Sequence, residues 1–186
     1  PERKGADGMF TLVVGDAASG KSEYAEQLIL RAGALPRYYV ATMEPFGAEA
    51  RARIARHRVL RAQKRFETIE CPVGLSRVLL PARGAALLEC LSNLAANELY
   101  SPAGAGGEQA ALAAVVDGVE SLRRQCEALV VVTGEVFSGG SAYAGDTGTY
   151  LRVLAAANRA LAARADAVCE VACGLPRYYK GEGAAL

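Results

Sequence analysis

The feature that most constrains this chain is a glycine-rich segment at residues 15–22, between an apolar run and a helix-forming run. The apolar run, residues 9–14, is typical of a buried strand, and residues 23–28 favour a helix. A tight turn with glycine at both ends lets the backbone amides curl inward, and the following helix points its N-terminus at the same place, which favours an anion. The pattern predicts a phosphate-binding loop formed by Gly15, Asp16, Ala17, Ala18, Ser19, Gly20, Lys21 and Ser22.

Two side chains of this loop are predicted to act on the phosphates. Lys21 would reach the β- and γ-phosphates as a mobile positive charge, which makes it a candidate catalytic residue. The Ser22 hydroxyl would supply one ligand to a Mg²⁺ ion that keeps most of its waters. Asp16 is unusual in such a loop, because a carboxylate repels phosphate unless it points outward.

The composition fits one compact domain. Of the 186 residues 52% are hydrophobic, and the formal net charge of +1 argues against a protein that mainly coats nucleic acid or membrane. No apolar run approaches the roughly 20 residues that span a bilayer, and the five cysteines form no Cys-x-x-Cys pair. We expect reduced thiols, a cytoplasmic location, a single domain over residues 9–186, and a disordered arm or expression remnant over residues 1–8.

Strand-like apolar runs alternate with helix-like segments along the rest of the chain, which is typical of a parallel sheet covered by helices on both faces. We therefore expect an α/β fold of the P-loop NTPase type, a three-layer sandwich with a mostly parallel central sheet. Besides residues 9–14, the expected strands are residues 38–42, 66–70, 85–89, 129–133 and 167–171. The expected helices are residues 21–32, 48–65, 73–79, 91–99, 108–127 and 150–164, and a turn at residues 174–176 ends the pattern.

Polar residues at the ends of two expected strands are candidate ligands of a nucleotide. Open α/β sheets bind ligands outside the carboxyl ends of their strands, so Thr42 and Met43 are predicted to line the cleft. Glu89 ends another buried strand, where P-loop proteins keep the acidic residue that holds magnesium directly or through water. The alternative for Glu89 is a carboxylate that caps the next helix.

The only histidine, His57, lies in a strongly basic segment, residues 51–65. At four-residue spacing Arg53, His57 and Arg61 share one stripe of a helix, where positive neighbours would keep the imidazole neutral. A neutral imidazole can attack phosphorus, and the arginines could neutralise a triphosphate under attack. The residues alone favour the other interpretation, a solvated basic helix with an incidental histidine.

A set of short motifs distributed over residues 9–181 changes that preference. Besides the phosphate-binding loop, the set consists of residues 39–42, 53–58 (Arg-Ile-Ala-Arg-His-Arg), 68–70, 87–90 (Leu-Leu-Glu-Cys), 132–136 (Val-Thr-Gly-Glu-Val) and 158–166. In these motifs the chain resembles the bifunctional adenosylcobinamide kinase and adenosylcobinamide-phosphate guanylyltransferase family of cobalamin biosynthesis. The resemblance implies that GTP guanylylates His57, that Mg²⁺ is the cofactor with GTP and ATP as substrates, and that the protein is a homotrimer. It also implies guanine-nucleotide contacts by the phosphate-binding loop and by Ala41, Thr42, Met43, Arg58, Arg61, Glu70 and Glu89.

The chain departs from the family pattern in one region. Most members have asparagine where Gly134 stands, and residues 137–142 and 148–152 replace two further motifs. The phosphate-binding loop, Glu89 and His57 are kept, so the resemblance still implies a two-step enzyme that phosphorylates adenosylcobinamide and then transfers GMP to the phosphate.

Two alternatives stay open. One is a P-loop kinase, for cobinamide or another alcohol, without guanylyl transfer. The other is a nucleotide-responsive protein that binds nucleic acid through residues 51–65. The near-neutral charge and the lack of aromatic residues in that segment count against nucleic acid as a partner.

Overall fold

The computed structural model describes residues 8–44, 55, 63–134 and 145–181. Its strands are β1 (Met9–Gly15), β2 (Arg37–Ala41), β3 (Phe66–Glu70), β4 (Gly84–Glu89), β5 (Cys126–Gly134), β6 (Ala167–Ala172) and β7 (Leu175–Lys180). Its helices are α1 (Lys21–Ala32), α3 (Leu91–Tyr100), α4 (Glu108–Gln125) and α5 (Asp146–Arg164), with a 3₁₀ helix, η1, at Leu75–Arg77.

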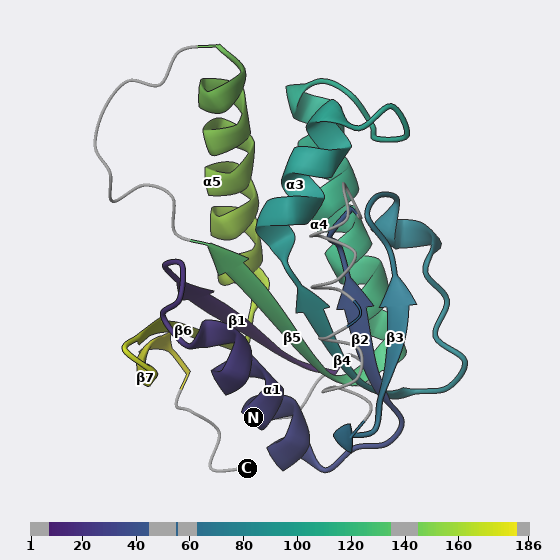
Figure 1. Ribbon diagram of the computed structural model, residues 1–186, viewed down its shortest axis with the longest axis vertical. Coiled ribbons are helices and arrows are strands. Elements are labelled where there is room, and N and C mark those ends of the chain that lie inside the picture. Colours follow the sequence, from purple (N-terminus) through teal and green to yellow (C-terminus); the bar gives the residue numbers. More distant parts are fainter. Residues whose placement is uncertain (1–7, 45–54, 56–62, 135–144, 182–186) are drawn as a thin grey trace.

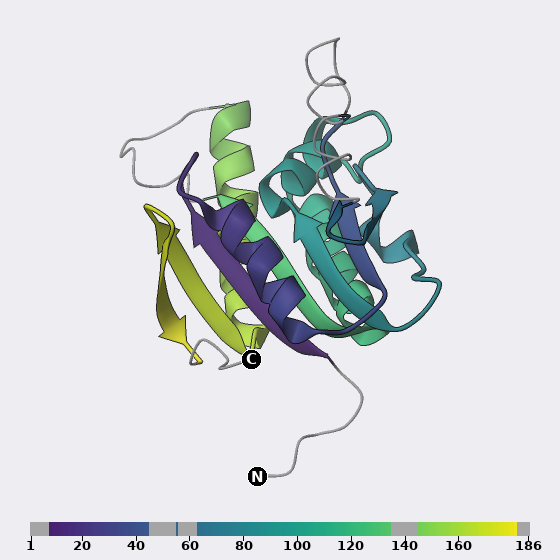
Figure 2. The same ribbon diagram turned by 60° about the horizontal axis from the view of Figure 1, so that its bottom comes forward.

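The strands form one sheet in the order β3-β2-β4-β5-β1-β6-β7, and all neighbours are parallel except β6 and β7. Helix α1 covers one face of this sheet, while α3, α4 and α5 cover the other (Figure 1, Figure 2). The fold class predicted from the alternation of strands and helices is therefore confirmed.

Most predicted elements are present with small differences in their bounds. Helix α1 and strand β3 have the predicted bounds, whereas α5 begins earlier than predicted, at Asp146, and only the short helix η1 forms within residues 73–79. The helix predicted for residues 48–65 lies mostly outside the described residues. No helix in the described part of the chain is long and apolar enough to cross a membrane.

The turn predicted at residues 174–176 is correct only for Gly174, because Leu175 and Pro176 already belong to β7, Leu175–Lys180, which pairs antiparallel with β6. The reversal occurs just before it, at Cys173 and Gly174, whose φ angles are 51° and 77°. Every residue of β7 is exposed except Tyr178, which is half-buried. A strand without a buried face lacks the apolar alternation on which its prediction depends.

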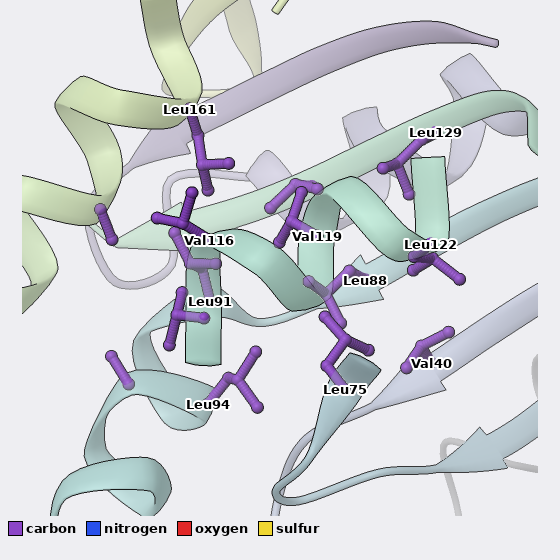
Figure 3. Packing of buried hydrophobic residues seen from close by; sticks show 14 of the residues in the cluster. Val40, Leu75, Leu88, Leu91, Leu94, Val116, Val119, Leu122, Leu129 and Leu161 are labelled. Atoms are coloured by element: carbon purple, nitrogen blue, oxygen red, sulfur yellow. The ribbon is translucent and has the colours of Figure 1, made fainter. Parts of the chain in front are cut away.

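Alternate residues of the central strands face two hydrophobic cores. Toward α1, Val130 of β5 packs in one cluster with Leu28. On the other face Leu88 lies in a larger cluster with Val119 and Leu122 of α4 (Figure 3). Each such buried side chain contributes about 1.5–3 kcal/mol. The strands are thus held on both faces, which keeps their carboxyl ends in place for the site described next.

Candidate active site

The phosphate-binding loop connects β1 to α1 at the carboxyl edge of the sheet (Figure 1). A Cβ atom at Gly15 would lie 2.5 Å from Ser19 Oγ and 2.8 Å from the carbonyl oxygen of Val171, so no larger residue fits there without a shift. Gly20 has a φ of 89°, in the left-handed region that favours glycine. Both glycines of the predicted motif are therefore required by the local backbone.

Polar groups of the loop bond to one another or are left for a ligand. Lys21 Nζ donates a hydrogen bond of 2.8 Å to the carbonyl oxygen of Asp16, and the Ser19 N–H donates to the same oxygen at 3.2 Å. Asp16 is exposed, which its charge requires beside an anion site. Ser19 Oγ is buried and has no hydrogen-bond partner among the described residues, so it is a polar atom available to a ligand.

Glu89, the last residue of β4, contacts the loop from the neighbouring part of the sheet. Its Oε1 accepts a hydrogen bond from the Ser22 hydroxyl, while its Oε2 is buried and has no partner among the described residues. Burial raises the pKa of Glu89, and hydrogen bonds from Ser22 and Tyr39 only partly oppose this. Lys21 favours the charged form as well, but the effect of burial is the largest, so the carboxylate is only partly stabilised by its neighbours.

The Ser22 and Glu89 oxygens suit Mg²⁺, which prefers oxygen ligands and binds through one or two protein groups together with water and phosphates. The orphaned Glu89 Oε2 marks the place where a cation would be favourable. No group of three or more His, Cys, Asp or Glu that could hold a metal occurs within the described ranges. The donor set thus fits a magnesium ion shared with a nucleotide better than a metal held by protein alone.

Thr42 serves as a structural link between β2, β4 and α3. It is 0% exposed, and its Oγ1 accepts a hydrogen bond from the Cys90 N–H at 2.7 Å and donates one to the Cys90 carbonyl oxygen at 2.8 Å. The Thr42 carbonyl oxygen accepts a further bond of 2.8 Å from Asn97 Nδ2. The hydroxyl of Thr42 therefore holds the peptide that follows Glu89, and its predicted contact with a nucleotide stays a prediction.

The other residues predicted to contact the nucleotide fall into two groups. Ala41 and Met43 are half-buried at the end of β2, and Glu70 is exposed at the end of β3, paired in register with Ala41. His57, Arg58 and Arg61 lie outside the described residues, as does Arg53. Their roles stay predictions.

A cavity of about 490 Å³ opens beside the phosphate-binding loop. We call it the phosphate cavity; it is lined by Gly15, Asp16, Ala17, Lys21, Cys90, Ser92 and Gly134. The last three were not predicted as site residues, although each follows or ends a strand at the carboxyl edge, the same rule that identified Glu89. Burial raises the pKa of the Cys90 thiol, so Cys90 stays protonated and is unsuited to be a nucleophile.

The hairpin of β6 and β7 supports the phosphate-binding loop from its other side. The Gly174 N–H donates a hydrogen bond of 2.8 Å to the carbonyl oxygen of Ser19, and a Cβ at Gly20 would lie 3.0 Å from Gly174 Cα. The hydroxyls of Tyr24 in α1 and Tyr178 in β7 lie 2.6 Å apart. The antiparallel hairpin thus contacts both the loop and the helix that follows it.

Comparisons with known proteins assign the chain to a family. The family model for cobinamide kinase / cobinamide phosphate guanyltransferase (CobU) matches residues 11–178. The bifunctional adenosylcobalamin biosynthesis protein CobP of Pseudomonas aeruginosa is 31% identical over 179 residues, which are 94% of this chain and 99% of CobP. The protein of the same description in Salmonella typhimurium, CobU, is 32% identical over 180 residues, 90% of this chain and 97% of the relative.

Solved structures of lower similarity were also found. The RadB recombinase has a TM-score of 0.47 at 18% sequence identity, and the match covers 89% of this chain and 74% of the RadB chain. The flagellar accessory protein FlaH from Methanocaldococcus jannaschii has a TM-score of 0.48 at 12% sequence identity, and the match covers 95% of this chain and 80% of the FlaH chain.

The family match spans the phosphate-binding loop, Glu89 and the segments that line the phosphate cavity, and the two curated relatives match over nearly their whole length. The chain therefore belongs to the cobinamide kinase / cobinamide phosphate guanyltransferase family, whose members are transferases of cobalamin biosynthesis.

Proposed function

We propose that this protein phosphorylates adenosylcobinamide and then transfers GMP from GTP to the adenosylcobinamide phosphate, giving adenosylcobinamide-GDP. The observation that carries the proposal is the contact between Ser22 and Glu89 beside Lys21, at the edge of the phosphate cavity. Such a set of groups suits a nucleoside triphosphate with its magnesium ion, and the family membership supports the two reactions.

In the kinase step, the hydroxyl of the aminopropanol arm attacks the γ-phosphorus of ATP or GTP. A bond forms between that oxygen and phosphorus as the bond to the bridging oxygen breaks, so that the nucleoside diphosphate leaves and the alcohol proton is released. Lys21 would balance the charge that develops on the phosphates, and no covalent bond to the protein is needed. Ser22 and Glu89 would hold the Mg²⁺ ion, which when bound neutralises phosphate charge.

In the transferase step, His57 acts as the nucleophile. A ring nitrogen attacks the α-phosphorus of GTP, pyrophosphate leaves, and GMP stays on the histidine as a phosphoramidate. A phosphate oxygen of the cobinamide phosphate then attacks the same phosphorus and releases His57. Dividing the displacement in two is the usual advantage of covalent catalysis. The Arg-Ile-Ala-Arg-His-Arg motif at residues 53–58 supports this role.

The remaining parts of the proposal concern partners. We infer adenosylcobinamide and the two nucleoside triphosphates as substrates, a homotrimer from the family resemblance, and no nucleic-acid partner from the net charge of +1. The cytoplasmic location and the single domain over residues 9–186 stay predictions.

The intact mass of the protein after incubation with GTP and Mg²⁺ tests the proposal. We expect an added GMP in the wild type, no adduct in His57→Ala, and none in Lys21→Ala. Phosphorylation of adenosylcobinamide without any adduct would leave the kinase-only alternative. That alternative has one specific support, since Gly134, where most members have asparagine, lines the phosphate cavity itself.

A further inference from the structure

Ser92, in the first turn of α3, lines the phosphate cavity but belongs to none of the motifs to which a role was assigned. The carboxyl end of β5 lies between those of β1, which leads into the phosphate-binding loop, and β4, which ends at Glu89. The register pairs Gly134, the last residue of β5, with Gly15, the first residue of the loop. The backbone therefore brings residue 134 next to the phosphate-binding loop, yet glycine has no side chain to offer a ligand there.

The hydroxyl of Ser92 occupies the space beside this glycine. The Gly134 N–H donates a hydrogen bond of 2.8 Å to Ser92 Oγ, and a Cβ at residue 134 would lie 3.0 Å from the same oxygen. That separation is tighter than an ordinary contact, so a side chain at residue 134 would press against the hydroxyl. Glycine at the strand end thus leaves room for a polar group that comes from α3.

The hydrogen bonds of Ser92 determine what it offers to a ligand. A serine hydroxyl has two acceptor lone pairs and one proton. The Gly134 N–H occupies one lone pair, so the proton and the second lone pair remain. Burial raises the pKa of Tyr150 of α5 and a hydrogen bond with the Ser92 side chain lowers it, so the phenol lies close to this hydroxyl. Ser92 can therefore donate its proton to an acceptor in the cavity while it keeps the bond from the Gly134 N–H.

The surroundings of Ser92 favour an anionic partner. Helix α3 starts at Leu91, its first turn has no side-chain cap, and Lys21 at the start of α1 lines the same cavity. Two helix N-termini, each with a positive partial charge, thus adjoin one cavity. A hydroxyl proton in such a place meets an oxygen of a phosphate more favourably than it meets a cation.

We propose that Ser92 donates a hydrogen bond to the terminal phosphate of a nucleoside triphosphate bound at the phosphate-binding loop. The proposal rests on the proposed nucleotide site, but not on the identity of the alcohol or on guanylyl transfer. The terminal phosphate is assigned because Ser92 lies close in sequence to Glu89, which with Ser22 would hold the ion that bridges the β- and γ-phosphates. The loop amides face the α- and β-phosphates instead. Ser92 contacts the transferred group and forms no covalent bond.

Nucleotide affinities test the proposal. The affinities of the protein for GTP and GDP are measured in the presence of Mg²⁺ with fluorescent analogues of both nucleotides. Because a hydrogen bond to a charged phosphate is lost, Ser92→Ala should weaken GTP binding about 10- to 100-fold, while the affinity for GDP changes less than about twofold. Ser76→Ala, which removes an exposed hydroxyl from η1 outside the cavity, is the matched control and should change neither affinity.

One further variant keeps the test decisive if Ser92→Ala folds poorly. Gly134→Ala places a Cβ against Ser92 Oγ and should weaken GTP binding selectively, by less than Ser92→Ala does. Equal losses for GTP and GDP, or no loss in a folded variant, would overturn the proposal, and so would a loss seen only in the KM of the alcohol. Failure of the proposed function would give a different result. The wild-type protein would then bind GTP and GDP with different affinities, but it would neither form a GMP adduct nor phosphorylate adenosylcobinamide.

Discussion

Glu89→Gln should make the protein more stable and less active, because the charge that Glu89 carries is unfavourable until a cation binds. The substitution keeps the shape of the side chain and the Oε1 that accepts the Ser22 hydrogen bond, but it removes the negative charge. The buried Oε2 has no hydrogen-bond partner among the described residues, and Ser22, Tyr39 and Lys21 offset the cost of burying the charge only in part.

The expected gain follows from the cost of leaving a buried polar group without a partner, which is about 1–3 kcal/mol. The glutamine amide retains part of that cost, since its NH₂ group also lacks an acceptor, so we expect a gain of about 1 kcal/mol in the free energy of unfolding. For a chain of 186 residues this raises Tm by about 2–4 °C. The kinase rate should fall about a hundredfold or more, as when one preorganised group of a transition state is removed.

The dependence of this gain on pH provides a second measurement. Burial places the folded-state pKa of Glu89 above its ordinary value of 4.5, so the folded protein binds the proton more tightly than the unfolded chain does. The free energy of unfolding of the wild type therefore contains a contribution that is lost as pH rises from 4.5 through the raised pKa. Glutamine does not titrate, so the advantage of Glu89→Gln should be small at low pH and complete above that pKa.

Glu98→Gln is the matched control for this prediction. Glu98 is 2% exposed, but its two carboxylate oxygens accept the Gly74 N–H at 2.6 Å and the Ala105 N–H at 2.9 Å. The glutamine oxygen can accept one of these bonds, but its NH₂ group faces the other N–H donor, so this variant should lose about 1–3 kcal/mol of stability. Thermal unfolding without nucleotide or Mg²⁺, together with a kinase assay, distinguishes the two glutamates. A Glu89→Gln protein that melts below the wild type, or that keeps its kinase rate, would refute the metal-ligand role.

Three further predictions concern the loop, the histidine and the hairpin. Lys21→Ala should abolish phosphorylation and guanylylation together, since both need the same phosphate-binding loop. Steady-state assays of each reaction measure this, and wild-type rates in the variant would show that the loop is misassigned. His57→Ala should remove GMP transfer while phosphorylation persists; in the wild type the adduct should survive alkali and be lost in mild acid, and an acid-stable radiolabel would indicate a different nucleophile. Tyr178→Phe breaks the bond to Tyr24 and should lower the free energy of unfolding by about 0.5–1.5 kcal/mol in urea titrations, whereas Tyr179→Phe, which loses an exposed bond to Glu170, should cost less.

The elements that could be predicted from the sequence are those with a buried face or a clear boundary residue. Helix α1 ends where Gly33 takes a φ of 70° and its N–H bonds to the Leu30 carbonyl oxygen, which is the reason glycine marks helix ends. Strand β7 was missed because its pairing with β6 and its contact with the phosphate-binding loop leave no periodic trace in its own residues.

Site residues could be predicted where their position in the chain, such as the end of a strand, determines their role. They could not be predicted where the role depends on contacts with residues far away in sequence. Glu89 was placed correctly at a strand end, and its contact with Ser22 follows from two strands that end at one edge. Thr42 satisfies the same rule, yet its hydroxyl is used by the backbone of Cys90, a pairing that depends on how β2 and β4 align. The importance of Ser92 depends on its hydrogen bond with Gly134, far away in sequence.

Charge in the phosphate cavity argues for a contribution from the basic segment at residues 51–65. Among the described residues that line the cavity, Lys21 is the one cation, while Asp16 lines it as an anion and Glu89 lies beside the loop. A bound triphosphate adds several negative charges, and one Mg²⁺ with one lysine cannot balance them together with both carboxylates. The loop amides and the helix N-termini offset part of this charge, further cations would be favourable, and residues 51–65 carry the densest run of arginine and lysine in the chain. Electrostatics thus gives the predicted contacts of Arg58 and Arg61 a reason that is independent of the family resemblance, and these contacts, like the role of His57, stay predictions.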